Sequence, residues 1–373
     1  MFFSLDDEQQ AFAATVREFL ADRFDLDAVR GVVEAGQGEH ADRGHPLSLW
    51  KGIADQGALA VLVPEEHDGL GLGLLEAQVI ARELGRGVAP GPWTPTVLAG
   101  EALRLAGSPE QQARWLPALA AGDTVGTVAV RGEGGSWDGR GITVDASGSG
   151  DDVRLSGSAS PVDYPAVAEI VIVAATDPSG TPGLYLVESG ASGLSVRDQG
   201  TYDGTARVGA IDLADAPAVA LEAAGPEAVG ALLGRGAVLT AADLVGIARE
   251  ALTRTVDYDR DRKQFGVPVG SFQAIKHTMA DLHVAVTMAE HAVLFAAHAV
   301  DAGDPGADLA VSVAKAKAST AAWDATGAMI QFFGGIGFTW EHEAHFFYKR
   351  ARRRVALFGS ADEHLDRVAS LTM

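Results

Sequence analysis

The spacing of hydrophobic and polar residues divides the chain into three stretches. In the first, apolar residues recur at intervals of three and four between charged positions, which is typical of amphipathic helices. Glycine and proline residues separate these periodic segments. The pattern predicts helices over residues 5–24, 46–56, 74–86, 95–106 and 109–121. Residues 1–123 are therefore expected to form an N-terminal α-helical domain.

The second stretch has the pattern of short strands. Runs rich in β-branched residues alternate with clusters of Gly, Ser, Asp and Pro, as in a succession of strands and turns. The runs are TVGTVAV (124–130), EIVIVAA (169–175), GLYLV (183–187) and VGAIDL (208–213). They predict a central antiparallel β-barrel or sandwich over residues 124–222.

Helical periodicity returns in the third stretch. It predicts long helices over 227–258, 272–300, 305–333 and 341–356, which form a C-terminal four-helix bundle over residues 223–373. A chain of 373 residues is too long for one hydrophobic core, in agreement with several domains. The expected fold class is α+β multidomain, in the order helical, β, helical.

Composition excludes several function classes. The formal charge of −21, from 29 basic and 50 acidic residues, argues against a nucleic acid or an anionic membrane as the main partner. Because the chain has no Cys, disulfides, thiolate metal sites and Cys nucleophiles are excluded. The N-terminus lacks the basic and apolar regions of a secretion signal, and no apolar run approaches the ~20 residues of a membrane span. We expect a soluble, cytoplasmic protein without membrane insertion.

Three short motifs resemble binding sites but are interpreted as ordinary structural segments. GLGLG (69–73) follows no convincing strand and lacks the full spacing of a dinucleotide-binding loop. His342 and His345 stand three residues apart, whereas the two histidines of a zinc-binding helix stand four apart, and no third ligand is apparent. We therefore expect no metal and interpret both as solvated helix residues. The basic run KRARRR (349–354) is read as an ordinary charged helix face, with a contribution to phosphates of a cofactor or of CoA as the alternative.

The most specific strings lie in the two helical stretches. They are YDRDRKQFGVPVGSFQAIKHTMADL (258–282), QFFGGIGFTWEHEAHFFYKRA (331–351), LWKGIADQGALAVLVPEEHDGLGLGLLEAQVIARELGR (49–86) and GSPEQQARWLPALAAGD (107–123). Together they resemble the acyl-CoA dehydrogenase family at both ends of the chain. The GIGFTWEH form is similar to the actinobacterial branch that handles steroid side chains.

This resemblance implies α,β-dehydrogenation of an acyl-CoA thioester, in fatty-acid or steroid side-chain β-oxidation, with FAD as cofactor and electron-transfer flavoprotein as acceptor. In the family, the R-x-Q-F-G, F-Q and Q-x-x-G-G elements hold the ADP half of FAD belonging to a neighbouring subunit. Carried over residue by residue, they assign this shared site to Arg262, Gln264, Phe265, Phe272, Gln273, Gln331, Gly334 and Gly335.

The residue types suit that role. A guanidinium donates two parallel hydrogen bonds to a phosphate, and adjacent glycines let backbone N–H groups come close to phosphate oxygens. Taken singly, Arg262 could be a surface ion pair, and Gly334 with Gly335 a helix–helix turn.

The part of the pattern that cradles the isoalloxazine departs from the family. In place of Thr-Glu-Pro…Gly-Ser-Asp the chain has VRGEGGSWDG (130–139), where Gly135 and Ser136 match but Trp137 replaces the Asp. In place of Trp-Ile-Thr it has GSASPVDYPAVAEIVIV (157–173), without a Trp. The resemblance therefore implies weakened contacts to a flavin of the chain's own.

The catalytic base of the family is also missing. Abstraction of an α-proton requires a positioned carboxylate, which the family places at one of two positions. These positions match Gly359 in LFGSADEHLDR (357–367) and Gly236 in LLGRGAV (232–238). Glu363, four residues past Gly359, and Asp243, two turns after Gly236 on the same helix face, are weak substitutes.

Three hypotheses follow from the resemblance. The chain is the subunit without the catalytic Glu in a heteromeric α2β2 acyl-CoA dehydrogenase, with a homologous chain as partner. Alternatively, it is an active homo-oligomeric dehydrogenase with an unusual base. In the third hypothesis it is a scaffold or acyl-binding protein of the same fold without a redox role.

Overall fold

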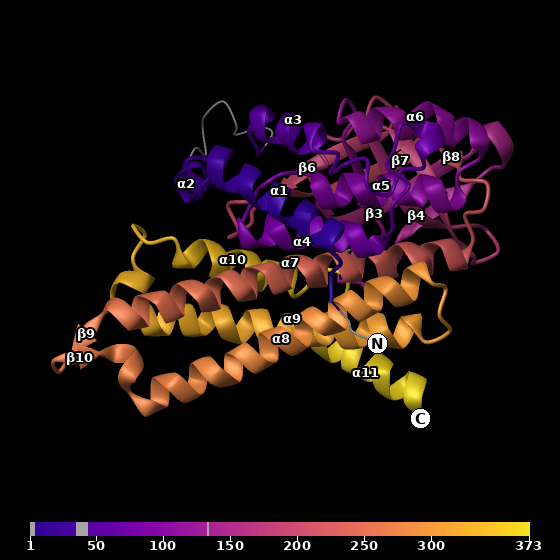
Figure 1. Cartoon of the computed structure of the whole chain (residues 1–373). Helices are drawn as coiled ribbons and strands as arrows, with labels where there is room; N and C mark the ends of the chain where they lie inside the picture. The colour runs from indigo at the N-terminus through magenta and orange to yellow at the C-terminus, as the bar shows by residue number, and fades with distance from the viewer. Residues whose placement is uncertain (1–3, 35–43, 133) are drawn as a thin grey trace. The chain divides into compact units, whose positions relative to one another are not determined.

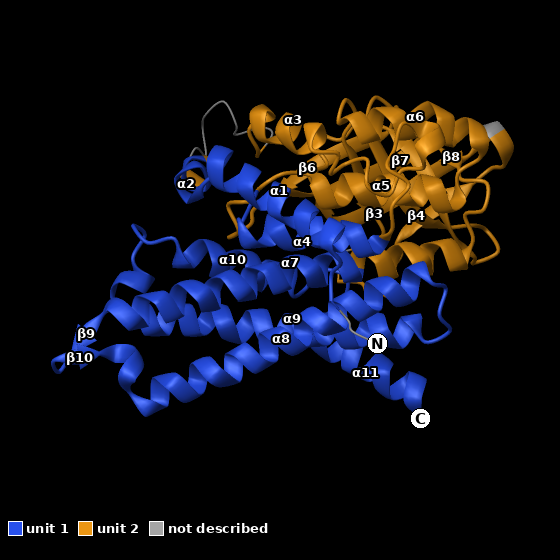
Figure 2. Cartoon of the chain, viewed as in Figure 1, with its two compact units in different colours: residues 1–31, 74–89, 237–373 blue, residues 32–73, 90–236 orange. Residues whose placement is uncertain are grey.

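A computed structural model describes residues 4–34, 44–132 and 134–373 (Figure 1). The chain forms two compact units that do not follow chain order (Figure 2). Unit 1 contains residues 1–31, 74–89 and 237–373, and unit 2 contains residues 32–73 and 90–236. Two N-terminal helices, α1 (Asp7–Arg23) and α4 (Leu74–Arg86), therefore belong with the C-terminal helices.

Unit 1 is helical. Beyond α1 and α4 it contains most of α7 (Pro226–Asp261), α8 (Gln273–Asp301), α9 (Ala307–Phe333), α10 (Ala344–Arg354) and α11 (Ala361–Thr372). Between α7 and α8 lies a two-stranded ribbon, β9 (Lys263–Gln264) and β10 (Val267–Pro268), followed by the 3-10 turn Val269–Ser271. The predicted long helices are confirmed to within a few residues, except that α10 begins at Ala344 and not at 341.

Helix α11 was not predicted, although its N-terminus has a clear signal. Ser360 accepts a hydrogen bond from the backbone of Glu363, and Glu363 accepts one from the backbone of Ser360, which forms a capping box. Glu363, a weak candidate for the base, is therefore held at the surface as a helix-capping residue.

Two glycines allow α4 and α7 to pack closely. A Cβ added to Gly85 would overlap the backbone of Asp243, and a Cβ added to Gly246 would overlap the carbonyl oxygen of Arg82. The two helices therefore meet backbone to backbone at this crossing.

Unit 2 combines helices with a sheet. Its helices are α3 (Leu47–Asp55), α5 (Trp93–Ala106) and α6 (Pro109–Ala121), with a 3-10 turn at Glu65–His67, while α2 (Leu26–Glu34) lies across the division. The strands are β1 (Gly126–Ala129), β2 (Val144–Ser147), β3 (Arg154–Asp163), β4 (Ile170–Thr176), β5 (Pro182–Glu188), β6 (Leu194–Gln199), β7 (Val208–Pro217) and β8 (Val219–Ala220).

The sheet has the order β6-β7-β3-β2-β4-β5-β8, with β1 also beside β4. It is mixed and not purely antiparallel as expected, because β1 and β2 both run parallel to β4. The long connections through β2 and β3 make this direction possible, since parallel neighbours cannot be joined by a tight hairpin. Ile170 to Ala175 of β4 are all buried, which explains why this strand reads as a continuous apolar run.

Two helices have the length and hydropathy of a membrane span, contrary to the expectation that no apolar run comes close. They are α7 and α8, with 83% and 33% of their apolar windows buried inside the protein. This is weak support for a membrane, because the core helix of a soluble protein passes the same test.

We expect Gly246→Ala to lower the free energy of unfolding by about 2–3 kcal/mol, because the added methyl group overlaps a backbone carbonyl and forces α4 and α7 apart. Gly234→Ala, in the same helix but with nothing within 4 Å of the added Cβ, is the control. It should be neutral or stabilise by up to about 1 kcal/mol. Urea unfolding of both variants checks this, and equal effects would contradict the close crossing.

Candidate functional site

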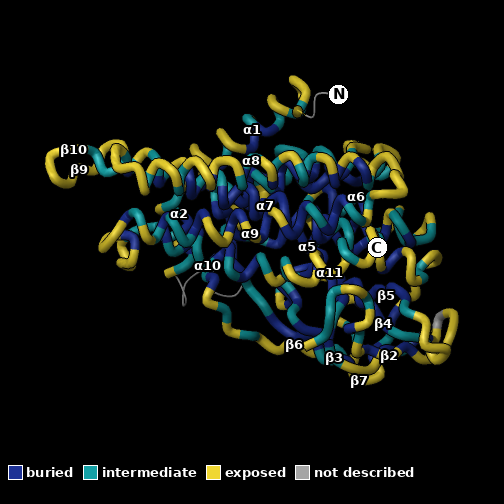
Figure 3. The backbone as a smooth tube through the Cα atoms, turned by 90° about the horizontal axis from the view of Figure 1, so that it is seen from below, coloured by how far each residue is buried: buried dark blue, intermediate teal, exposed yellow. Residues whose placement is uncertain are grey.

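The motif R-x-Q-F-G lies on the ribbon that follows α7. Phe265 and Gly266 form the turn of this ribbon with positive φ angles of 54° and 82°. The side chain of Phe265 is 93% exposed, and its ring meets Phe272 edge-on at 6.2 Å between centroids. In Figure 3 the ribbon is an exposed projection at one end of unit 1. A pair of exposed aromatic rings on a projecting turn is typical of a surface that binds something else.

The second motif, at the end of α9, is held beside the end of α7 by aromatic stacking. Tyr258 stacks on Phe333 at 4.3 Å, and its hydroxyl donates to the Phe333 carbonyl at 3.4 Å. Gly334 ends α9 with φ of +66°. The structure thus places the two motifs at the same end of unit 1, although they are far apart in sequence.

All eight residues predicted to contact FAD are exposed. Arg262 makes no side-chain hydrogen bond or ion pair with any residue of the described ranges, so the simple alternative of a surface ion pair is wrong. Gly334 and Gly335 do form the predicted turn, and added Cβ atoms there would meet nothing within 4 Å. A free guanidinium, exposed rings and open backbone fit the ADP half of a dinucleotide.

The turn that carries Gly359 is closed. Phe358 and Gly359 both have positive φ angles, of 54° and 102°. The Nε2 of His364 donates to the Phe358 carbonyl at 2.8 Å. A Cβ on Gly359 would lie 2.6 Å from that Nε2 and 2.9 Å from Cδ2. The ring of His364 therefore occupies the space into which a side chain at position 359 would extend.

His364 is neutral at physiological pH. Burial is the main reason that its pKa is lowered to about 4, and the charge of Lys315 acts in the same direction. A neutral ring with its proton on Nε2 is what the bond to Phe358 requires, since Nε2 must donate to a carbonyl.

A buried lysine holds the same turn. The Nζ of Lys315, which is 0% exposed, donates to the carbonyls of Gly359 at 2.7 Å and Val355 at 3.1 Å and to the hydroxyl of Ser319 at 3.1 Å. Burial lowers the pKa of Lys315 to about 7. These three bonds tie the end of α10 and the turn at Gly359 to α9.

Asp243, the other weak candidate for the base, is fully engaged. Its carboxylate is 2% exposed and accepts hydrogen bonds from Arg350 Nε at 3.1 Å and Nη2 at 2.6 Å, with Arg354 Nη2 at 3.5 Å. Burial alone would raise its pKa, but the charges of Arg350 and Arg354 outweigh burial and lower it. A buried carboxylate with two bonds from one guanidinium is poorly suited to take a proton from a substrate.

Comparison with known proteins identifies the family. Models of the acyl-CoA dehydrogenase N-terminal and C-terminal domains match residues 6–123 and 224–371. The acyl-CoA dehydrogenase IpdE2 of Mycobacterium tuberculosis is 32% identical over 98% of this chain and 97% of that protein. The chain belongs to the acyl-CoA dehydrogenase family. The family consists of FAD-dependent oxidoreductases.

Two similar solved structures are named as pairs of chains. One is the ChsE4–ChsE5 complex from Mycobacterium tuberculosis, with a TM-score of 0.91 and 30% identity over 99% of this chain and 98% of that chain. The other is a variant of the Tcur3481–Tcur3483 steroid ACAD, with a TM-score of 0.89 and 31% identity over 98% and 97%.

The loop that replaces the family's first flavin string is bonded to itself. The Nε of Arg131 donates to the carbonyl of Gly135, and its guanidinium lies 5.1 Å from the centre of the Trp137 ring. Ser136 donates to Asp138 at 2.5 Å. The matching residues Gly135 and Ser136 are thus used inside the loop, while Glu133 lies outside the described residues.

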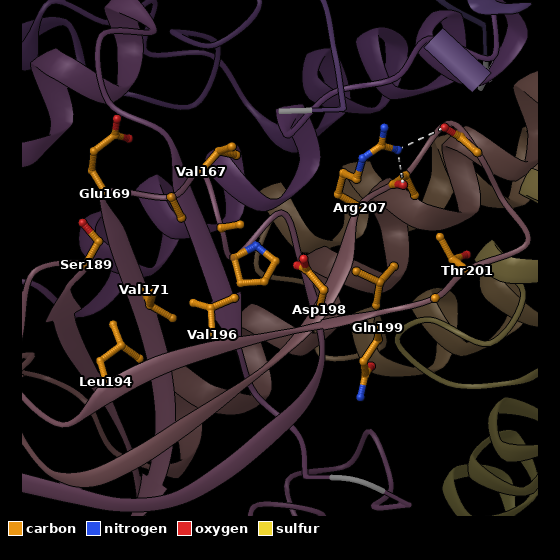
Figure 4. Close-up of a pocket in the computed structure, with 17 residues that line it drawn as sticks. Val167, Glu169, Val171, Ser189, Leu194, Val196, Asp198, Gln199, Thr201 and Arg207 are labelled. Atoms are coloured by element: carbon orange, nitrogen blue, oxygen red, sulfur yellow. Dashed lines mark hydrogen bonds between the residues drawn. The ribbon is translucent and has the colours of Figure 1, made fainter. Parts of the chain in front are cut away.

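The segment that replaces the second string borders a groove of unit 2 (Figure 4). This groove has a volume of about 1030 Å³, an apolar wall that includes Val171, Leu194 and Val196, and polar groups that include Asp198 and Arg207. Arg207 donates to two backbone carbonyls of its own loop. None of the lining side chains has a buried polar atom without a partner, so we assign no chemistry to the groove.

His342 and His345 are packed on aromatic rings and are not solvated helix residues as expected. His342 precedes α10, lies 4.4 Å from the ring of Phe333 and accepts a hydrogen bond from the Ala344 backbone. His345 stacks on Trp340 at 4.5 Å. Within the described ranges, no group of three or more His, Asp or Glu side chains is arranged to hold a metal.

The basic run is also not a solvated helix face. Arg350, Arg353 and Arg354 are at most 8% exposed, and the first of them binds Asp243 and the carbonyl of Ala89. Lys349 lies 4.2 Å over the ring of Trp340. Sequence reasoning assigned these residues to solvent because burial of three arginines on one short helix depends on a carboxylate far away in the chain.

Sequence reasoning missed Lys315 and His364. A signal existed for Lys315, because it falls on the buried stripe of α9 with Val311, Ala318 and Ala322 at intervals of three and four. A lysine on an otherwise apolar stripe predicts a buried partner. His364 had no signal, because its contact with Gly359 depends on the shape of the turn.

We expect Gly359→Glu to lower the free energy of unfolding by about 2–4 kcal/mol, because it combines backbone strain with displacement of His364. Gly303→Ala is the control, because Gly303 has a φ of +62° and an added Cβ would meet nothing within 4 Å. Only backbone strain then lowers the free energy of unfolding, by about 1–2 kcal/mol. Adding His364→Ala to Gly359→Glu should cost less than the sum of the single changes. Additive effects in urea unfolding would show that the ring does not close this position.

The contribution of Lys315 should depend on pH. Between its pKa of about 7 in the folded protein and 10.5 in the unfolded chain, the unfolded state binds more protons, so stability rises with pH. The stability advantage of the wild type over Lys315→Met should therefore be larger at pH 9 than at pH 7. Lys317→Met, at an exposed position of the same helix, should show no such change. A constant difference between wild type and Lys315→Met would rule out the lowered pKa.

Proposed function

We propose that this chain is the subunit without a catalytic base in a two-component acyl-CoA dehydrogenase. It supplies contacts to the ADP half of an FAD whose isoalloxazine lies in a homologous partner chain, in an α2β2 assembly. The observation that carries the proposal is the closed turn, in which His364 fills the space beside Gly359 and Lys315 holds the backbone.

A difference between the two halves of the cofactor site supports this division of labour. The residues that would serve a neighbour's cofactor are retained and exposed, as Arg262 and Phe265 illustrate. The loop that would serve the chain's own flavin is closed on itself through Arg131 and Gly135. The substitute base Asp243 is buried in an ion pair with Arg350.

In this proposal the role of the chain is to bind and orient the cofactor. When bound, FAD supplies the two-electron acceptor for α,β-dehydrogenation. Arg262 and Gln264 would donate hydrogen bonds to the pyrophosphate, and the Gly334–Gly335 backbone would let N–H groups come close to it. Phe265 and Phe272 would exclude water from the adenosine side. Proton abstraction from the acyl thioester falls to a carboxylate of the partner.

The names of the relatives support the proposed assembly and substrate class. Two similar structures are named as pairs of chains, and one of these is described as a steroid ACAD. We infer a fatty-acyl or steroid side-chain thioester as substrate, electron-transfer flavoprotein as acceptor and a cytoplasmic location. The exposed apolar residues Val284, Met288 and Phe295 on one helix, α8, give such a tetramer a surface to bury.

The proposal predicts that activity needs two chains. The chain purified alone should show no acyl-CoA-dependent dye reduction, whereas co-expression with a homologue that keeps the carboxylate should give an active complex with flavin absorbance. Arg262→Ala in this chain should lower the FAD content of the complex, because one charge-assisted contact to the pyrophosphate is lost.

The other two hypotheses give different results in the same experiments. Full turnover by the chain alone would show an active enzyme with an unusual base. A complex whose FAD content does not depend on Arg262 would support a scaffold without a redox role. Arg260→Ala, two residues earlier on the exposed end of α7, is a matched control for the loss of charge.

A further inference from the structure

A guanidinium on α10 is held between two aromatic rings. The Cζ of Arg352 lies 3.0 Å from the centre of the Trp323 ring on α9 and 4.3 Å from that of Tyr348, one turn earlier on its own helix. Cation–π attraction to two rings holds the guanidinium in place.

The donors of this guanidinium have no acceptor. Its Nε and Nη1 atoms are buried without a hydrogen-bond partner, and the side chain makes no ion pair or hydrogen bond with any residue of the described ranges. Arg350 on the same helix is bonded to Asp243. Nη2 is neither buried nor bonded within the described ranges, so it is the donor of Arg352 that is open to an acceptor from outside the chain.

The guanidinium is directed along α9 toward the proposed cofactor contacts. A Cβ on Gly327 would lie 3.7 Å from Arg352 Nη2, and this Nη2 is its nearest neighbour. Trp323, Gly327 and Gln331 follow each other at intervals of four, so they lie on one stripe of the helix. Gln331 is one turn, about 6 Å, beyond the residue next to Nη2.

We propose that Arg352 binds a phosphate of the nucleoside diphosphate half of the shared cofactor. This inference rests on the proposed function, and it adds a residue outside the motifs that assigned the site. The planar fork suits a phosphate, and Gly327 leaves the space beside Nη2 free of a side chain. Nη2 is the donor that this phosphate can reach, because Nε and Nη1 are buried by the chain itself.

Measurement of FAD affinity in the co-purified complex tests this. We expect Arg352→Ala to raise the FAD dissociation constant, from flavin fluorescence, about tenfold or more, because a charge-assisted bond is lost. Arg352→Lys should restore affinity only in part, since an ammonium lacks the fork. Lys349→Ala, which removes a neighbouring cation held over Trp340, is the matched control and should change affinity by less than about threefold.

A second readout does not use the flavin. Addition of ADP to complex freed of FAD should change tryptophan fluorescence in the wild type, and the change should be lost in Trp323→Phe and in Arg352→Ala. Absence of any ADP-dependent signal from Trp323 would overturn the assignment, as would an affinity for FAD that is the same in Arg352→Ala and Lys349→Ala.

The variants separate failure of this inference from failure of the proposed function. If Arg262→Ala weakens FAD binding and Arg352→Ala does not, the inference fails and the proposed function stands. If neither change affects FAD binding, the proposed function fails as well. If Arg352→Ala separates the two chains, as seen by light scattering, and leaves the FAD affinity of the remaining complex unchanged, Arg352 meets an acidic side chain of the partner and the phosphate assignment is wrong.

Discussion

The space beside the Cα of Gly359 is the constraint on which the functional account depends. His364 fills this space and donates to Phe358, and Lys315 gathers the carbonyls of Val355 and Gly359 from the other side. These contacts stabilise a turn whose backbone angles favour glycine. Because the turn is built around the missing side chain, a carboxylate cannot return there by one substitution without loss of stability. The packing around Gly359 therefore serves the folding of this chain.

The same principle applies to the other candidate carboxylate, Asp243. Asp243 could be taken for a base from its place on α7, but it neutralises Arg350 at the crossing of α4, α7 and α10. Glycines at positions 85 and 246 bring the helix backbones so close that this ion pair is sealed from water. Breaking a buried pair leaves an uncompensated charge, so Asp243 is kept for structure. Packing therefore leaves no room for a carboxylate at position 359 and keeps Asp243 in an ion pair.

The long elements could be predicted from the sequence, and the details of the site could not. The long helices α7, α8 and α9 lie within a few residues of their predicted bounds, and β4 reads as an apolar run because it is buried on both faces. The short helices α2 and α11 were missed, and the two parallel strand pairs were not foreseen, since strand direction depends on connections and not on local pattern. The motifs indicated eight candidate cofactor contacts, and the structure shows that all of them are exposed. The contact of Arg352 with Trp323 and that of His364 with Phe358 depend on tertiary structure, so no local pattern reports them. For Lys315 the apolar stripe of α9 predicts burial, but it does not name the carbonyls that Lys315 binds.

Native mass spectrometry of the co-purified complex tests the central claim most directly, because it counts cofactors and chains in the same particle. The account predicts two copies of this chain, two of the homologous partner and two FAD molecules, with no FAD on assemblies of this chain alone. One FAD for every copy of this chain in a homo-oligomer that oxidises acyl-CoA would contradict it.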